Sequence, residues 1–187
     1  INMNDLTNMV VPEVYPALEL RCEEYGFDQP SDLHIGALLK SLVASKPNSN
    51  ILELGTGIGL SLSWMIEGLE KHSRITSLDN DPKLIALAKE YFDDDARVTI
   101  LCEDGEEWIE QYSGDKFDLI FADTWPGKYN HLEETLDLLE VGGLYVVDDM
   151  NEEPNWPEGH AEKANQLIQT LENKAGLTVV KMDWSTG

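Results

Sequence analysis

Three glycines, Gly55, Gly57 and Gly59, stand at alternate positions after a short apolar run that begins at Asn50. A buried parallel strand that ends in such a turn suits a bound ligand, because glycine lets the backbone turn sharply and lets a ligand come close. Glu53 lies two residues ahead of the first glycine, where its carboxylate would repel a pyrophosphate and suit a cationic head such as an ammonium group. Dinucleotide sites use the spacing Gly-x-Gly-x-x-Gly instead, and a tight turn without a ligand is the alternative.

On these residues the chain resembles the class I S-adenosylmethionine-dependent methyltransferases, whose first motif is Glu/Asp-x-Gly-x-Gly-x-Gly. The resemblance implies that the stretch from Glu53 to Gly59, Thr56 included, binds S-adenosyl-L-methionine. It also implies an α/β fold of the Rossmann-like, doubly wound kind, with a mostly parallel sheet and helices on both faces. A final antiparallel strand belongs to that fold, and the printed sequence stops at Ser185-Thr186-Gly187, where its hairpin would turn.

Asp79 ends a predicted strand roughly twenty residues beyond the glycines, the distance expected of an acid that binds ribose hydroxyls. A carboxylate suits a diol because it can accept a hydrogen bond from each hydroxyl. We therefore assign Asp79 and its neighbour Asn80 to cofactor binding. A turn residue ahead of Asp81-Pro82 is the alternative for Asp79.

Three further residues are assigned to the cofactor. The resemblance places Asp104 and Gly105 near the adenine amine, although Asp104 is equally suited to cap a helix. Ser61, in the first turn after the glycines, could donate with nearby amides to the methionine carboxylate. Its alternative is a helix residue that faces solvent.

A second stretch of the sequence points to one group within the class I methyltransferases. The segment Phe117–Trp125, with Tyr129 and with Gly142-Gly143 ahead of Asp148-Asp149, is similar to the small-molecule O-methyltransferases of the catechol and caffeoyl-CoA type. In that family an acid after strand four and an Asp-Asn pair after strand five hold a divalent cation. The resemblance therefore implies Mg²⁺ or Ca²⁺ on Asp123, Asp148 and Asp149, where it would bind both oxygens of a vicinal diol and lower a hydroxyl pKa.

The chain departs from that family at the catalytic base. Pro126 stands where the family has its lysine, and Asp149 stands where it has asparagine. Lys128 and Asp123 are our candidate catalytic residues, and Lys128 is the candidate base. A solvated loop lysine is the alternative for Lys128. His160 is a second candidate, because its loop should overhang the same end of the sheet; a histidine at a helix start with no catalytic part is its alternative. Trp125 matches an aromatic residue that borders the adenine and the acceptor, with a core or lid tryptophan as its alternative.

The elements that would position these residues alternate between strands and helices. Ser31 is predicted to cap a helix whose apolar face includes Leu39 and Val43. Asp81 with Pro82 should begin another helix. The remaining predictions are a strand from Asn50, a helix at Leu60–Leu69, strands at Arg74–Asp79, Arg97–Cys102 and Phe117–Ala122, a helix at Tyr129–Glu140, a strand at Leu144–Val147, a helix at Gly159–Lys174 and a sixth strand at Leu177–Trp184.

The chain of 187 residues suits one cofactor-binding α/β domain, assigned to residues 31–187. Residues 1–30 show no clean periodicity, and Pro12 and Pro16 interrupt any long helix. This segment is expected to be a lid over the active site or a contact in a homodimer, with plain surface packing as the alternative.

Composition limits partners and location. A formal charge of −23 with only 13 lysines and arginines disfavours nucleic acid, because such a surface repels phosphates. No apolar run is long enough to cross a membrane, and no basic-then-apolar signal opens the chain. Cys22 and Cys102, the second in a predicted buried strand, suggest reduced thiols and a cytoplasmic protein.

The sequence therefore predicts an enzyme that moves a methyl group from S-adenosyl-L-methionine to an oxygen of a small molecule, with divalent metal assistance implied by the narrower resemblance. Two alternatives stay open. One is a cofactor-binding module without catalysis, because the family's lysine is missing. The other is an NAD(P)-dependent oxidoreductase, which the glycine spacing and Glu53 disfavour.

Overall fold

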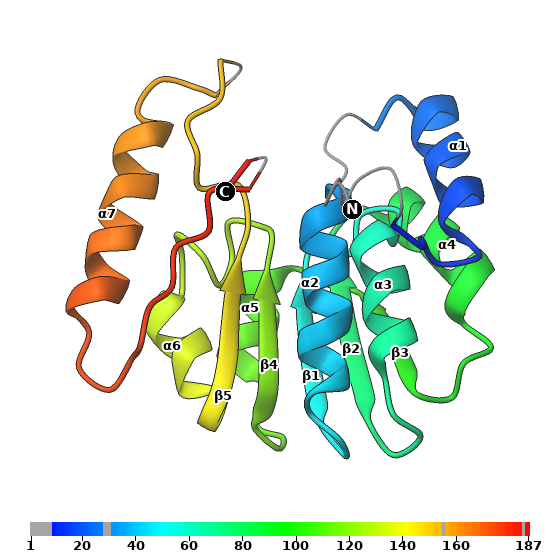
Figure 1. The fold of residues 1–187 in the computed structure, drawn as a ribbon, viewed down its shortest axis with the longest axis horizontal. Coiled ribbons are helices and arrows are strands. Elements are labelled where there is room, and N and C mark those ends of the chain that lie inside the picture. The colour runs from blue at the N-terminus through cyan, green and yellow to red at the C-terminus, as the bar shows by residue number, and fades with distance from the viewer. Residues whose placement is uncertain (1–8, 28–30, 155, 185) are drawn as a thin grey trace, which may run out of the picture.

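The computed structural model describes residues 9–27, 31–154, 156–184 and 186–187. Helices and strands alternate along most of this length, as the sequence predicts (Figure 1). The helices are α1 (Tyr15–Tyr25), α2 (Leu33–Ala44), α3 (Leu60–Gly68), α4 (Pro82–Phe92), α5 (Gly105–Gln111), α6 (Leu132–Asp137) and α7 (His160–Asn173). The strands are β1 (Asn50–Leu54), β2 (Arg74–Asp79), β3 (Val98–Cys102), β4 (Phe117–Ala122) and β5 (Leu139–Val147).

The five strands form one sheet in the order β3-β2-β1-β4-β5, and each neighbouring pair is parallel. The chain moves outward from β1 to β3, then returns to the other side of β1 with β4. The strand order therefore switches between β1 and β4. In open α/β sheets, ligands bind beyond the carboxyl ends of the strands at such a switch.

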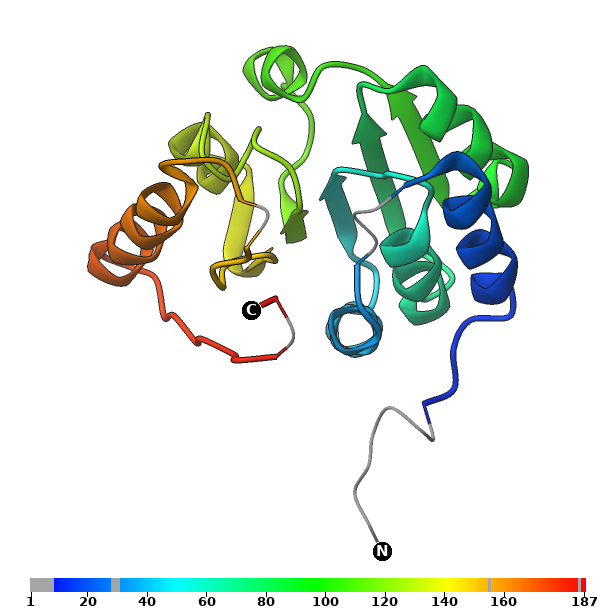
Figure 2. The ribbon, with the colours of Figure 1, turned by 90° about the horizontal axis from the view of Figure 1, so that it is seen from above.

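Helices cover both faces of the sheet (Figures 1 and 2). One hydrophobic cluster joins α1, α2, α3 and α4 to the sheet, with Trp64 and Leu39 almost fully buried in it. A second cluster, which includes Ile109 of α5 and Phe117 of β4, fills the opposite side. Both faces of β1 are therefore shielded from water, which suits its three apolar residues, Ile51, Leu52 and Leu54.

Local sequence signals explain several helix starts. Asp81 and Asp104 cap α4 and α5 with their side chains, and Pro82 opens α4, as predicted. The predicted cap of α2 is wrong: Asp32, not Ser31, accepts hydrogen bonds from the amides of His34 and Ile35. The Ser31 hydroxyl instead donates to Asp123 at 3.4 Å.

Two other boundaries differ from the prediction. The helix expected at Tyr129–Glu140 is reduced to α6, because the amides of Lys128, Tyr129 and Asn130 all turn back to the carbonyl of Trp125. Strand β5 begins at Leu139 and passes through the glycine pair at 142–143, with a register irregularity against β4. Pro16 does not prevent α1, because proline is tolerated in the first turn of a helix.

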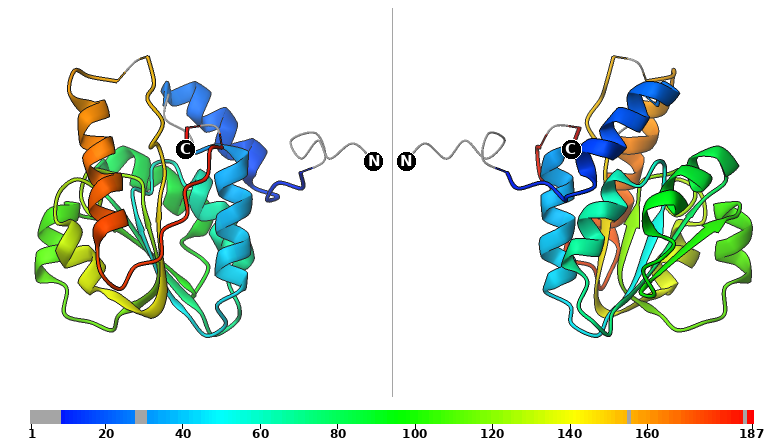
Figure 3. Two further views of the ribbon diagram at one scale, coloured as in Figure 1. Left: turned by 60° about the vertical axis from the view of Figure 1, so that its left-hand side comes forward. Right: turned by 90° about the vertical axis from the view of Figure 1, so that its right-hand side faces the viewer.

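The predicted sixth strand is wrong. Residues 177–184 have no regular secondary structure and run from α7 back toward the carboxyl end of the sheet (Figures 1 and 3). Backbone hydrogen bonds then join Met150 to Gly187 and Asn151 to Thr186. The predicted hairpin tip at Ser185 lies outside the described residues.

Both cysteines are free, as expected. Cys102 is exposed rather than buried, because β3 is an edge strand of the sheet. Among the residues that the structure describes, no helix combines the length and the apolar character needed to cross a membrane.

Candidate functional site at the carboxyl edge of the sheet

The glycine turn follows β1 at the switch in strand order. Gly55 and Gly57 have φ angles of 107° and 51°, which favour glycine. A Cβ on Gly55 would lie 2.6 Å from the Thr124 side chain, so the loop after β4 closes on the turn. A Cβ on Gly57 would lie 3.1 Å from the Phe27 ring, which brings the described part of the N-terminal segment over the same turn.

Asp79 is joined directly to the glycine turn. Its carboxylate accepts hydrogen bonds from the amides of Gly57 and Asp81, each at 3.0 Å. A cavity of about 60 Å³ lies beside it between the ends of β1, β2, β3 and β4. The cavity is lined by Leu54, Gly55, Leu78, Asp79, Asn80, Glu103, Gly105, Thr124 and Pro126. The structure thus brings together four of the residues assigned to the cofactor.

Glu53 does not lie where the sequence suggests. Its side chain is completely buried, so it does not offer its carboxylate to an ammonium group. The Ser61 hydroxyl is 2.5 Å from one carboxyl oxygen, and the Ser77 hydroxyl contacts the other. Burial raises the pKa of Glu53 to about 8, and the hydrogen bonds from the two serines only partly offset it.

Thr56 and Ser61 are buried as well. The Thr56 hydroxyl lies 2.6 Å from that of Ser77, and its amide donates to the carbonyl of Leu78. Its side chain therefore holds the turn in place and does not line the cavity. Ser61 is only 3% exposed, so the solvent-facing alternative is wrong.

Three carboxylates follow β4 and β5, as predicted. Burial raises the pKa of Asp123 well above its usual range, and the charges of Asp148 and Asp149 add to the effect. Burial and Asp149 likewise raise the pKa of Asp148 to about 6. One oxygen of Asp123, Oδ1, is buried and has no hydrogen-bond partner among the described residues.

These carboxylates do not form a ready-made metal site. In the described part of the chain, no group of three or more acids, histidines or cysteines is arranged to hold a metal ion. Asp148 accepts instead from the amide of Asp149 at 2.9 Å and from the Thr186 hydroxyl at 3.4 Å. The predicted ligands therefore do not fit a divalent cation without rearrangement.

Lys128 is buried close to the three acids. Its ammonium donates to the backbone carbonyl of Asp148 and, at 3.5 Å, to that of Asp149. Burial lowers the pKa of Lys128, while the nearby carboxylates act in the opposite direction. The bend at Gly127, with a φ angle of 80°, turns Lys128 inward, so its solvated-loop alternative is wrong.

Aromatic side chains surround this end of the sheet. Trp125 is 44% exposed, and its ring packs near Tyr129 and His160 rather than against the small cavity. His160 also contacts Trp156, and its Nε2 lies 3.3 Å from the Tyr129 hydroxyl. Burial lowers the pKa of His160, so the neutral ring is favoured.

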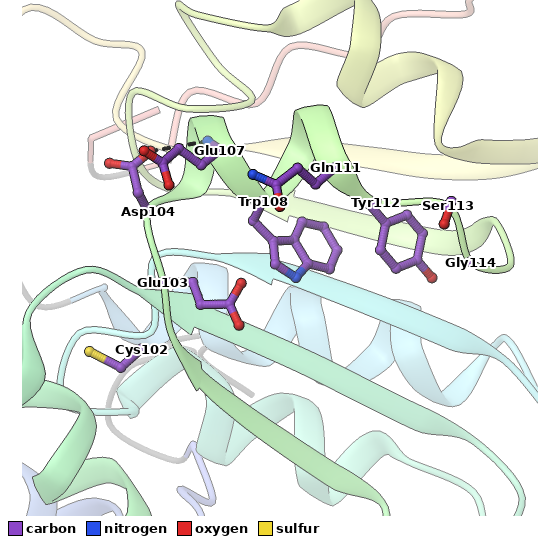
Figure 4. Close-up of a pocket in the computed structure, with 9 residues that line it drawn as sticks. All are labelled: Cys102, Glu103, Asp104, Glu107, Trp108, Gln111, Tyr112, Ser113 and Gly114. Atoms are coloured by element: carbon purple, nitrogen blue, oxygen red, sulfur yellow. Dashed lines mark hydrogen bonds between the residues drawn. The ribbon is translucent and has the colours of Figure 1, made fainter.

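A larger cavity of about 670 Å³ is lined by Asp104 and other residues between Cys102 and Gly114 (Figure 4). The stacked rings of Trp108 and Tyr112 line it, with Cys102 and Glu107 among its other residues. The Asp104 carboxylate caps α5 through the amides of residues 106 and 107, so the capping interpretation is confirmed. This cavity does not include the glycine turn.

Sequence reasoning missed Ser77. Strand register places it directly opposite Glu53, which explains the contact. The only signal was a glutamate within an apolar strand, because such a buried acid must find polar partners on a neighbouring element. Phe27, Thr124 and Trp156 were missed too, since their places depend on loops.

Comparisons with known proteins agree with this architecture. The O-methyltransferase family matches residues 29–177. A Mycobacterium avium protein named "Putative O-methyltransferase" is 30% identical over 118 residues, which are 60% of this chain and 53% of that protein. The chain therefore spans about half the length of the curated relatives it matches.

Solved structures show the same fold at lower identity. A Corynebacterium glutamicum protein superposes with a TM-score of 0.81 at 18% identity, over 97% of this chain and 90% of that one. The O-methyltransferase from Bacillus cereus, solved in complex with SAH, gives 0.77 at 19% identity, over 91% and 84%. Together with the family match over most of its length, this fold shows that the chain belongs to the O-methyltransferase family.

Proposed function

We propose that the protein transfers a methyl group from S-adenosyl-L-methionine to an oxygen of a small molecule. The observation that carries the proposal is the direct contact between the glycine turn and Asp79, 3.0 Å from the amide of Gly57, at the switch in strand order. Two similar structures, from Bacillus cereus and Streptomyces achromogenes, were solved with SAH and SAM respectively. These support the same cofactor here.

In this reaction the cofactor supplies an electrophilic methyl group, so the protein must align the two reactants and remove a proton. Lys128 is the proposed base, since it is buried beside Asp123, the other proposed catalytic residue, and burial favours its neutral form. His160 is the second candidate, because its neutral ring lies in the aromatic cluster near Lys128.

The acceptor is proposed to bind among Trp125, Tyr129, Trp156 and His160. The rings of these side chains contact one another and come from two segments of the chain, residues 125–129 and residues 156–160. Flat rings favour an acceptor with an aromatic or apolar body.

Binding of the cofactor product can be tested with a variant at Asp79. Asp79→Ala removes an acceptor for two ribose hydroxyls, and hydrogen bonds to a charged group contribute about 1–3 kcal/mol each. The dissociation constant for S-adenosylhomocysteine should therefore rise about 10- to 100-fold, as measured by calorimetry. Asp94→Ala, at an exposed aspartate after α4, is the matched control and should bind like the wild type. Equal affinity of the Asp79 variant would remove the ribose assignment.

Whether a divalent metal ion binds is tested separately. Because the described acids form no ready-made ligand set, we derive no catalytic step through a metal. We expect Mg²⁺, Ca²⁺ or a chelator to leave the melting temperature unchanged, since an ion that binds the folded state would raise it. A rise with either ion would mean that Asp123, Asp148 and Asp149 rearrange around it.

Other proposals follow from the same assignment. A titration with NADH should show no binding, whereas S-adenosylmethionine should bind; the reverse would favour an oxidoreductase. Cofactor binding without turnover across a panel of acceptors would favour a silent module. The cytoplasmic location, the absence of nucleic acid partners, and a lid or a homodimer contact at residues 1–30 stay predictions.

A further inference from the structure

The loop that carries Lys128 is attached to strand β5 at two neighbouring points. The Tyr145 hydroxyl, on β5, donates a hydrogen bond to the backbone carbonyl of Gly127. The next residue, Lys128, extends its side chain to the carbonyls of Asp148 and Asp149, just after the end of β5. This part of the chain therefore holds both the backbone ahead of Lys128 and the nitrogen at the end of its side chain.

Gly127 lies in a narrow space between three elements. A Cβ on this glycine would collide with the Leu54 side chain at the end of β1 and would lie 3.3 Å from Oγ1 of Thr135 on α6. Tyr145 packs against the second hydrophobic cluster, which contains Leu54. Backbone hydrogen bonds within the loop join residues 127–130 to Trp125 and to one another, so they shape the loop without tying it to the sheet. The Tyr145 hydroxyl supplies such a tie.

The Lys128 nitrogen has little freedom of position. The side chain is only 5% exposed, and the nitrogen lies 5.3 Å from the centre of the Tyr129 ring, at the proposed acceptor site. In a neutral lysine the two N–H hydrogens can go to the carbonyls of Asp148 and Asp149, which leaves the lone pair for a proton of the acceptor. Because Gly127 directly precedes Lys128, a shift of its carbonyl would move this nitrogen or turn its lone pair away.

We propose that Tyr145 is a positioning residue for Lys128: its hydroxyl fixes the carbonyl of Gly127 and thereby places the Lys128 nitrogen for the acceptor. The inference rests on the proposed function, in which Lys128 is the base. As the acceptor oxygen bonds to the methyl carbon, its proton passes to the Lys128 lone pair and the electrons of the carbon–sulfur bond stay on sulfur. Tyr145 takes no part in this exchange. Burial raises the pKa of Tyr145 well above its usual range, so the hydroxyl keeps its hydrogen for Gly127.

The experiment is a double-mutant cycle on Tyr145 and Lys128, with labelled S-adenosylmethionine and with catechol and 2-naphthol as acceptor probes. Tyr145→Phe removes the hydroxyl and keeps the ring. It should lower kcat about tenfold, because a small misplacement of a reacting group has a large effect on rate. Tyr145 does not line the cofactor cavity, so the dissociation constant for S-adenosylhomocysteine and the KM for the acceptor should stay unchanged. In a Lys128→Met protein the same change should have no further effect, since no base is left to position.

Tyr112→Phe is the matched control. The Tyr112 hydroxyl also donates to a loop carbonyl, that of Asp115 at 2.7 Å, but this loop lies ahead of β4, at the end of the strand away from the site. The control should keep the kcat of the wild type. Thr135→Ala is a second variant in case Tyr145→Phe does not fold, because the Thr135 side chain lies against Gly127 from α6. It should also lower kcat, and only in a protein that has Lys128.

A crystal structure of Tyr145→Phe gives a readout that needs no acceptor. The Lys128 nitrogen should have left the carbonyl of Asp148, whereas an unchanged lysine would refute the positioning role. Losses in kcat that are as large without Lys128 as with it, or an unchanged kcat, would refute it too and leave the proposed function in place. If the wild type binds S-adenosylhomocysteine but methylates neither probe, the crystal structure decides the role of Tyr145. If it does not bind S-adenosylhomocysteine at millimolar concentration, both proposals are refuted.

Discussion

Lys128→Met is expected to lower the methyl-transfer rate about 100-fold or more, the usual scale for loss of a general base. The methionine has a similar length but cannot accept a proton. Lys128 is buried among the carboxyl ends of β4 and β5, and burial lowers its pKa, both of which suit the role. The rate should be measured in single turnovers with labelled S-adenosylmethionine once an acceptor is found.

Stability must be separated from catalysis in this variant. The Lys128 ammonium satisfies the carbonyl of Asp148 and is the cation that interacts with Asp123, so its removal should also lower the melting temperature. The rate is therefore compared well below that temperature, with S-adenosylhomocysteine binding as the test of folding. Lys83→Met is the matched control, because that side chain is exposed on α4.

A Lys128→Met enzyme with nearly full activity would remove Lys128 from the mechanism. His160→Gln then becomes the decisive variant, because His160 is the second candidate base and its ring contacts Trp125 and Trp156. Loss of activity in that variant alone would assign the base to His160.

Glu53 should make the protein less stable as the pH rises. Its pKa is about 8 in the folded protein against an ordinary value of 4.5, so between these values the folded state binds a proton that the unfolded state has lost. The free energy of unfolding should therefore fall with pH by about 1.4 kcal/mol per unit, or roughly 4 kcal/mol between pH 5 and pH 8. Below both pKa values this contribution is fully present.

Glu53→Gln should lack this slope, because the amide does not titrate. Urea unfolding of both proteins at several pH values gives the comparison, and Asp123 and Asp148, which also have raised pKa values, contribute equally to each. Parallel curves for the two proteins would mean that Glu53 is ionised in the folded state.

Much of the fold could be predicted because its signals are local. The bounds of β4 follow from a run of mostly apolar residues, and the starts of α4 and α5 follow from Asp81 with Pro82 and from Asp104. Each of these signals is contained within a few neighbouring residues. The alternation of such elements then predicts a parallel sheet, since a strand, a helix and a strand in sequence return in the same direction.

Features that depend on residues far apart in the sequence were decided only by the tertiary structure. The apolar stretch at residues 177–184 has strand-like composition, but it forms no strand because no neighbour in the described sheet pairs with it. Lys128 points inward because Gly127 bends the loop toward β5.

Glu53 is the clearest case. Its position in the sequence suggested a carboxylate facing a ligand, whereas strand register places it opposite Ser77 and helix α3 brings Ser61 to its other oxygen. Sequence spacing determines which residues stand near the ligand turn. Whether a side chain faces the ligand or the core is decided by pairing between strands and by burial, which alter both its contacts and its charge.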